Sequence, residues 1–254
     1  MIYDIQNASI LKRISAFLLD FILMCILAVG FTYLLSLATN LESYSNQLKE
    51  IYDRYEAEYG VNFEEMTADK YEKLTDAERA KFDEAYDALS KELSETKATS
   101  MFYSLALVCL SVGLLLSFLI LEFLLPLLLK NGQTVGMKVF GLGVVFTNSV
   151  RVNTFAMFVR SILGKFTLET MVPLLVLLML LFNVLGIVGL VVLLALVILQ
   201  IALFATTKTR SFIHDVISNT VIVDINCQMI FDNYDELVSY KEQLAQEEAE
   251  KSKY

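Results

Sequence analysis

Four long apolar runs separate the polar parts of this sequence. They occupy residues 14–38, 101–129, 168–185 and 186–206. Each is close to or above the roughly 20 residues that a helix needs to cross the hydrocarbon core of a bilayer. The last two runs meet at Asn183, Gly186 and Gly189, residue types that favour a tight turn. The pattern predicts four membrane-spanning helices, the last two forming a helical hairpin.

The segment between the first two runs, residues 40–98, is polar but periodic. Apolar side chains recur there at spacings of three and four in two stripes, which are Tyr44, Leu48, Ile51, Tyr55 and Tyr59, and then Phe82, Tyr86, Leu89 and Leu93. Such spacing is typical of amphipathic helices. Thr75 and Glu78 have the spacing of a capping box at a helix start. We predict two helices packed on each other outside the bilayer; the alternative is a solvated acidic spacer.

Two short stretches have the pattern of strands. Residues 139–146 and 150–152 flank Thr147-Asn148-Ser149, which is a plausible hairpin turn, and residues 220–225 are rich in β-branched side chains. We predict a small sheet that joins these pieces. Residues 153–165 fit an amphipathic helix on the inner membrane surface. The acidic tail, residues 233–254, is predicted to be an exposed helix.

These elements define an all-α fold class, a polytopic membrane bundle of four transmembrane helices with small strand and amphipathic elements. Six parts follow along the chain: the first span with its leading residues at 1–39, the acidic insertion at 40–98, the second span at 99–130, a Gly-rich loop with short strands and the amphipathic helix at 131–167, the hairpin of spans at 168–206, and a His-Asp segment with the acidic tail at 207–254.

The basic residues predict the orientation of the chain. With four spans, the basic residues of the connections all lie on one side of the membrane: Lys12, Arg13, Lys130, Lys138, Arg151, Arg160, Lys165, Lys208 and Arg210. Because basic residues are enriched in cytoplasmic connections, both termini and residues 131–167 are expected in the cytoplasm. The insertion then lies outside, and the plasma membrane is the expected location.

Composition and charge exclude several function classes. The chain is 56% hydrophobic and 19% charged, and its net charge of −9 comes almost wholly from the insertion and the tail. A nucleic-acid partner is therefore not expected. Cys25, Cys109 and Cys227 lack metal-ligand spacing, so we expect neither a metal nor a cofactor. The motifs of common hydrolases are missing from the sequence, and an enzyme is not predicted.

Three polar side chains interrupt the apolar runs at similar depth. Asp20, Glu122 and Gln200 each lie six or seven residues from the cytoplasmic end of their run, which corresponds to about 9–10 Å along a helix. Ionisable groups at that depth usually mark function. Two nearby carboxylates in low dielectric would favour a shared cation or a bound proton. The alternative is a structural cluster in which Arg13, Arg160 or Gln200 satisfies the acids.

His214 is the sole histidine and precedes Asp215. The pair is either pH-sensitive or a packed loop histidine beside its acid. Asp215 is expected to accept hydrogen bonds from backbone amides or to pair with Arg13.

The sequence resembles the RDD family of membrane proteins, named for one arginine and two aspartates. The stretch from Lys12 to Asp20 resembles the family's opening, with Arg13 and Asp20 in the first two positions. The segment that contains Gly132, Thr134, Gly136 and Lys138 and ends at Gly141 is similar to its Gly-x-Thr-x-Gly-Lys-x-x-x-Gly motif, with Met137 at the usual lysine. His214 and Asp215, followed by residues 220–223, resemble the closing motif. Residues 40–98 lie outside the resemblance as an insertion.

The glycines of the middle motif are expected to let the chain turn back tightly against the inner membrane surface. The motif lacks the spacing of a nucleotide-binding P-loop.

Two functions follow from these patterns. The family resemblance implies transport, with sodium–proton exchange in some members. The buried carboxylates suit such a role in a protein that works within the lipid bilayer. Four spans make a thin bundle, which a homo-oligomer could complete. The alternative is a membrane-embedded binding, assembly or regulatory protein. In that case residues 40–98 or the acidic tail recruit a protein partner and the buried charges are structural.

Overall fold

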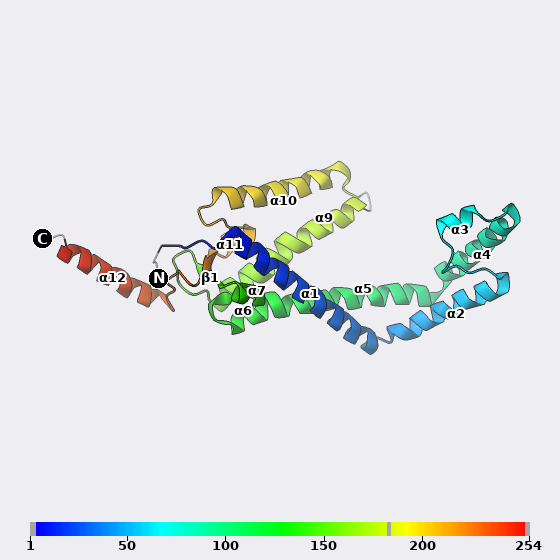
Figure 1. Ribbon diagram of the computed structural model, residues 1–254, viewed down its shortest axis with the longest axis horizontal. Coiled ribbons are helices and arrows are strands. Elements are labelled where there is room, and N and C mark those ends of the chain that lie inside the picture. The colour runs from blue at the N-terminus through cyan, green and yellow to red at the C-terminus, as the bar shows by residue number, and fades with distance from the viewer. Residues whose placement is uncertain (1–3, 182–183, 252–254) are drawn as a thin grey trace. The chain divides into compact units, whose positions relative to one another are not determined.

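The computed structural model describes residues 4–181 and 184–251 (Figure 1). Within these ranges, four helices are long and apolar enough to cross a membrane: Ile10–Ala38, Lys97–Leu128, Thr154–Leu180 and Gly186–Thr206. The four spans predicted from the apolar runs are therefore confirmed by length and composition. Asn183, which was assigned to the turn between the last two spans, lies outside the described residues.

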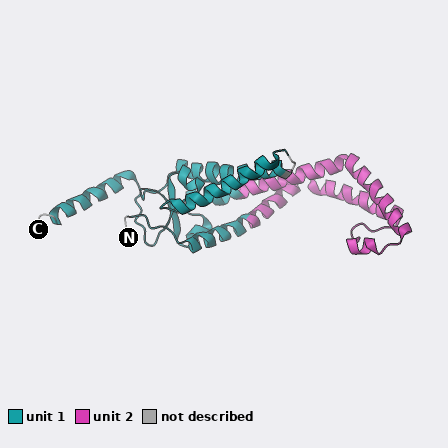
Figure 2. Cartoon of the chain, turned by 90° about the horizontal axis from the view of Figure 1, so that it is seen from above, with its two compact units in different colours: residues 1–24, 118–254 teal, residues 25–117 magenta. Residues whose placement is uncertain are grey.

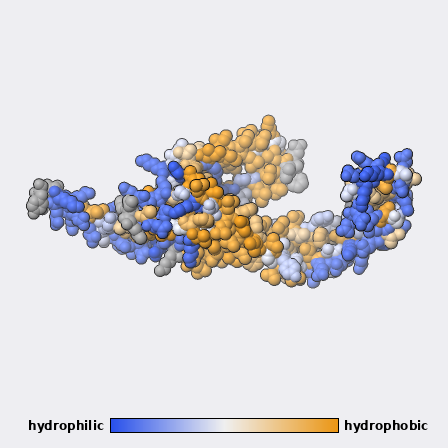
Figure 3. All heavy atoms as spheres, viewed as in Figure 1, coloured by the Kyte–Doolittle hydropathy of each residue, from blue (hydrophilic) through white to orange (hydrophobic). Residues whose placement is uncertain are grey.

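The spans expose apolar side chains over most of their surface. Figure 3 shows hydrophobic residues gathered over α1 (Ile10–Ala38), α5 (Lys97–Phe118), α9 (Val172–Leu181) and α10 (Gly186–Thr206). Leu11 and Ile187, for example, are each 78% exposed. A helix that is apolar on all sides is stable where lipid tails replace water, so these surfaces suit a bilayer.

The third span differs from the prediction. We expected a separate surface helix at 153–165 and a span from residue 168, but α8 (Thr154–Phe158), the π-helix η3 (Val159–Met171) and α9 form one continuous helix. Asn153 caps its start, since its side chain accepts a hydrogen bond from the amide of Ala156 at 2.8 Å. The charges at Arg160 and Lys165 do not end the helix because each finds an acidic partner.

The second span likewise combines several helical types. After α5 the chain continues as the π-helix η1 (Leu119–Leu124) and the short helix α6 (Leu125–Leu128), in which Pro126 lies near the start. Proline cannot donate to the preceding turn, and the carbonyl of Glu122, four residues before it, instead accepts a hydrogen bond from the hydroxyl of Ser161 at 2.6 Å.

The chain divides into two compact units, residues 1–24 with 118–254 and residues 25–117 (Figure 2). The second unit contains the insertion as three helices, α2 (Leu41–Tyr59), α3 (Ala68–Glu72) and α4 (Asp76–Glu95). Arg54 of α2 forms a 2.5 Å ion pair with Glu92 of α4, and Tyr55 donates to the same carboxylate at 2.9 Å. Ala85 and Leu89 are buried. Residues 40–98 therefore contain the expected pair of packed helices.

A small sheet lies in the other unit. Strands β1 (Leu142–Phe146) and β2 (Thr220–Asp224) pair antiparallel, with Val144 opposite Ile222. The predicted turn at Thr147–Ser149 is present, but only an isolated bridge between Val145 and Arg151 follows it in place of a second hairpin strand. The expected strand start at Val139 was wrong, because that residue ends the short helix α7 (Val135–Val139).

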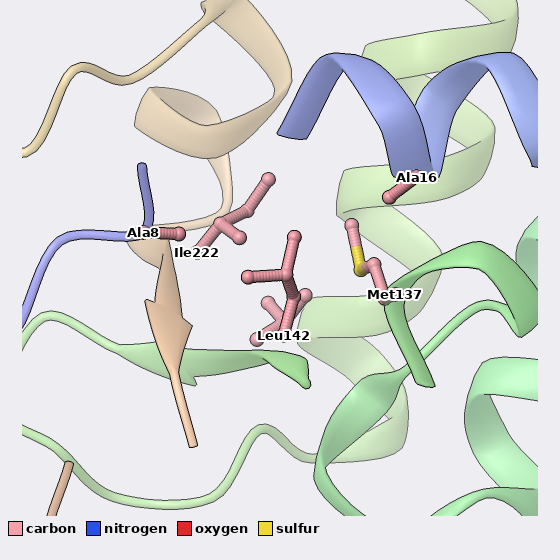
Figure 4. Packing of buried hydrophobic residues seen from close by; sticks show 6 residues of the cluster. Ala8, Ala16, Met137, Leu142 and Ile222 are labelled. Carbon is pink, nitrogen blue, oxygen red and sulfur yellow. The ribbon is translucent and has the colours of Figure 1, made fainter. Parts of the chain in front are cut away.

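A hydrophobic cluster joins α1 and α7 to the sheet. Its buried residues are Ala8, Ala16, Met137, Leu142, Val144 and Ile222. Figure 4 shows Met137 of α7 below Ala16 of α1, with Leu142 beside it. A second cluster, Val150, Phe231 and Leu237, anchors the start of α12 (Tyr234–Lys251), the exposed helix expected in the tail.

The insertion offers a direct test of the capping prediction. Thr75 and Glu78 form the full capping box at the start of α4. The substitution Thr75→Ala should lower the local stability of α4 by about 0.5–2 kcal/mol, because an unpaired amide then remains at the helix start. Hydrogen exchange in the first turn of α4 in the full chain measures this effect. Thr67→Ala, at the start of α3, should leave exchange in α4 unchanged.

Candidate functional site

Asp20 of α1 is bound by the first turn of α7. One carboxylate oxygen accepts a hydrogen bond from the hydroxyl of Thr134 at 2.5 Å, and the other accepts from the amide of Gly136 at 2.7 Å. Asp20 is only 7% exposed. Thr134 also caps α7, since its hydroxyl oxygen accepts from the amide of Met137 at 3.2 Å. The Gly-rich motif therefore surrounds Asp20 with neutral hydrogen-bond donors.

Position 136 requires glycine because two backbones meet there. A Cβ atom on Gly136 would lie 2.2 Å from the carbonyl oxygen of Ala16 and 2.8 Å from Asp20 Oδ2. Gly132 lies in the turn before α7, with φ of 58°. Lys138, at the far end of α7, is exposed. The motif thus acts through its backbone and the hydroxyl of Thr134.

Glu122 of η1 has a different partner. Its carboxylate pairs with Lys165 of η3 at 2.5 Å, and its backbone carbonyl accepts a hydrogen bond from the hydroxyl of Ser161 at 2.6 Å. Asp20 lies within electrostatic range of both Glu122 and Lys165. Asp20 and Glu122, the two acids predicted to lie at similar depth, therefore interact electrostatically. Each is bonded to different groups, however.

Asp215 and Arg160 form an ion pair that is almost completely buried. Arg160 also donates to the hydroxyl of Thr220 at 2.8 Å, and Asp215 accepts from the amide of Phe212 at 3.2 Å. Their side chains are 2% and 1% exposed. Burial raises the pKa of Asp215, but the charges of Arg160 and His214 outweigh it and hold that pKa at about 2.

The expected pair between Arg13 and Asp215 is not formed. Arg13 instead donates to the backbone carbonyls of Arg210 at 2.8 Å, Ile222 at 2.8 Å and Thr209 at 3.4 Å. Arg160 already bonds to Asp215, and the carbonyls around Arg13 provide acceptors for its guanidinium. Arg13 therefore ties the start of α1 to β2 and to the segment after α10.

His214 belongs to the short helix α11 (Ile213–Ile217), which packs along η3. Its ring Nδ1 lies 2.7 Å from Glu169, and its backbone amide donates to the same carboxylate at 3.0 Å. Gln200 accepts from the amide of Ile213 at 3.2 Å and also bonds to Glu169. Gln200 thus positions α11 and lies apart from the groups that bind Asp20.

Glu169 was missed from the sequence. It lies at the edge of the third apolar run, where an acid is expected to lie at the membrane boundary. The signal available in the sequence was an acid placed between Lys165 and Pro173. In the structure one helix continues through both of these residues.

Comparison with known proteins gave a match to one family. The model of the RDD family matches residues 7–219. Neither the curated proteins nor the solved structures gave a significant match. The match includes Arg13, Asp20 and Asp215, the arginine and the two aspartates of the sequence resemblance.

Two Arg–Asp pairs among the described residues provide a matched experiment. Arg160→Met should lower the free energy of unfolding by about 3–5 kcal/mol, because Asp215 would then be a buried charge without its cation. Arg151 and Asp232 form a 2.8 Å pair with side chains 39% and 66% exposed, so Arg151→Met should lower it by less than about 1 kcal/mol. Denaturation in detergent micelles measures both. Equal losses would contradict a structural role for the buried pair.

Proposed function

The chain belongs to the RDD family, and we propose that it is a transporter that exchanges Na⁺ and H⁺ by means of its buried carboxylates. Family membership and four helices able to cross a bilayer identify a multi-pass membrane protein. The exchange activity is the step that we infer from the charged groups of the site.

The environment of Asp20 is the observation that carries this proposal. Glu122, Glu169 and Asp215 are bonded to Lys165, His214 and Arg160 respectively. Asp20 is bonded to the hydroxyl of Thr134 and the amide of Gly136, which are neutral. A carboxylate in a membrane helix without a bonded cation gains most from taking up a proton or a metal cation. Hydroxyl and carboxylate oxygens are also the ligands that hard cations prefer.

Lys165 and Glu122 provide a means of coupling. Both lie within electrostatic range of Asp20. A cation bound at Asp20 would repel Lys165 and strengthen its attachment to Glu122, whereas an empty, charged Asp20 would attract Lys165. The proposed exchange uses this competition, and Arg13 and Arg160 hold the surrounding helices in place.

We also propose that both termini and the Gly-rich loop face the cytoplasm and that the protein lies in the plasma membrane. The cluster of basic residues beside the cytoplasmic ends of the four spans supports this orientation. We further propose a homo-oligomer, because a second copy would supply additional helices to line a pathway.

The proposed exchange predicts the effect of neutralising Asp20. In proteoliposomes that contain a pH-sensitive dye, a Na⁺ gradient should drive proton flux, and Asp20→Asn should lower its initial rate by about tenfold or more, because the site loses its charge. Asp53→Asn makes the same chemical change at an exposed position of α2. That control should retain the wild-type rate.

A second candidate function is the recruitment of a protein partner by the insertion, which is supported by the packed helices α2 and α4. If recruitment is the function, replacing residues 44–94 by a short flexible linker should abolish the cellular phenotype. Asp20→Asn would then lower only stability. Wild-type proteoliposomes without Na⁺-dependent proton flux would exclude exchange.

The proposed orientation predicts opposite labelling of two cysteines. Cys227 is exposed, and an impermeant maleimide should modify it in inside-out vesicles but not in intact cells. Ser90→Cys, at an exposed position of α4, should be modified in intact cells. Cys227→Ala controls for reaction at other cysteines. The reverse pattern would contradict the orientation.

A further inference from the structure

The two ring nitrogens of His214 lie in unequal surroundings. Nδ1 is 2.7 Å from Glu169 Oε2. Nε2 is buried without a hydrogen-bond partner among the described residues, and it lies 3.6 Å from Asp215 Oδ2. The ring therefore lies between two carboxylates but is bonded to only one of them.

This geometry fixes the neutral form of the ring. A carboxylate only accepts hydrogen bonds, so the hydrogen of neutral His214 must be on Nδ1, toward Glu169. Nε2 then carries a lone pair that faces Asp215, which has no hydrogen to give. A proton added to Nε2 would replace that unfavourable contact by an N–H that points at a carboxylate oxygen.

The π-helix η3 makes this arrangement possible. Arg160 and Glu169 are nine positions apart, which is about two and a half turns of an α-helix and would place them on opposite faces. A π-helix has hydrogen bonds between residues five apart, so each turn contains more residues and the same nine positions make fewer turns. Arg160 can therefore bind Asp215 while Glu169 binds His214, both on α11. Gly164 lets the helices approach, since a Cβ there would lie 2.5 Å from His214 Cβ.

We propose that His214 is a proton-binding site, in which Nε2 takes a proton from the aqueous phase and the imidazolium is held by Glu169 and Asp215. No bond within the protein breaks in this step. The new N–H points at Asp215 Oδ2, which also accepts from the amide of Phe212, while Arg160 is bonded to Oδ1 of the same carboxylate. The assignment of this proton to the exchange reaction rests on the proposed function.

The charges around His214 determine the pH at which it binds a proton. Burial lowers the pKa of His214; Asp215 and Glu169 oppose this effect, and Arg160 and Lys165 reinforce it. The charged groups that face the ring are, from η3, Arg160, Lys165 and Glu169, from α11 Asp215, and from η1 Glu122. The net effect is a lowered pKa. The unfolded chain, with a histidine pKa of about 6.5, then binds the proton first. The free energy of unfolding should therefore fall as the pH drops below about 6.5.

A single histidine makes the test direct. The full-length protein, purified with an affinity tag that contains no histidine and labelled with ¹⁵N-histidine, should give one pair of ring signals. Near pH 7.5 these should report hydrogen on Nδ1, and on acidification they should titrate with a midpoint below about 6.5. Glu169→Gln should lower the midpoint by about half a pH unit or more, because it removes a charge that stabilises the imidazolium. Glu242→Gln, in the exposed part of α12, should leave the midpoint unchanged.

Two outcomes would overturn the site. They are hydrogen on Nε2 at pH 7.5, and signals that do not titrate between pH 8 and about 4.5 while the protein stays folded. Flux measurements separate this inference from the proposed function. If His214 titrates as expected and the wild type shows no flux, the proton site stands and exchange is rejected. If flux depends on Asp20 and His214→Gln keeps the wild-type pH profile, exchange stands and the assignment of the His214 proton to the exchange reaction is rejected.

Discussion

The buried ion pair between Arg160 and Asp215 is the interaction on which the rest of its unit, residues 1–24 with 118–254, depends. Two charges removed from water are tolerated only when they meet with good geometry and satisfied hydrogen bonds. Thr220 accepts a hydrogen bond from Arg160 Nη1 and the amide of Phe212 donates one to Asp215, whereas Arg160 Nη2 is buried without a hydrogen-bond partner among the described residues. Because the partners lie on η3 and α11, the pair also fixes which face of the third span lies inward. The neighbouring contact between Glu169 and His214 follows from the same register.

The acids of the candidate site fall into two kinds. Glu122, Glu169 and Asp215 are each bonded to a basic side chain, and they hold helices together. Among the described residues, Asp20 accepts hydrogen bonds only from a hydroxyl and an amide. Gly136 is needed there because a larger residue would clash with the backbone of α1. The difference in partners separates structural acids from the one proposed to bind an ion. Burial alone would not separate them, because ion pairs and functional acids are both buried.

Four membrane-spanning helices say little about function by their fold. The proposed exchange rests on the chemistry of Asp20, and the proposed proton site rests on the two sides of one imidazole ring. The packed helices of the insertion keep a binding role open as the competing account, and the flux and deletion experiments lead to opposite results for the two.

The sequence by itself predicted the four spans, the capping box at Thr75 and, to within one residue, the strand that starts at Thr220, because hydropathy and local spacing depend only on neighbouring residues. The tertiary structure decided that Asp215 pairs with Arg160, that Arg13 binds carbonyl oxygens, and that Glu169 joins the site. Long side chains can reach several partners, and their choice depends on which distant backbones meet. The π-helical register settled that choice, since in an α-helix Arg160 and Glu169 would face opposite ways.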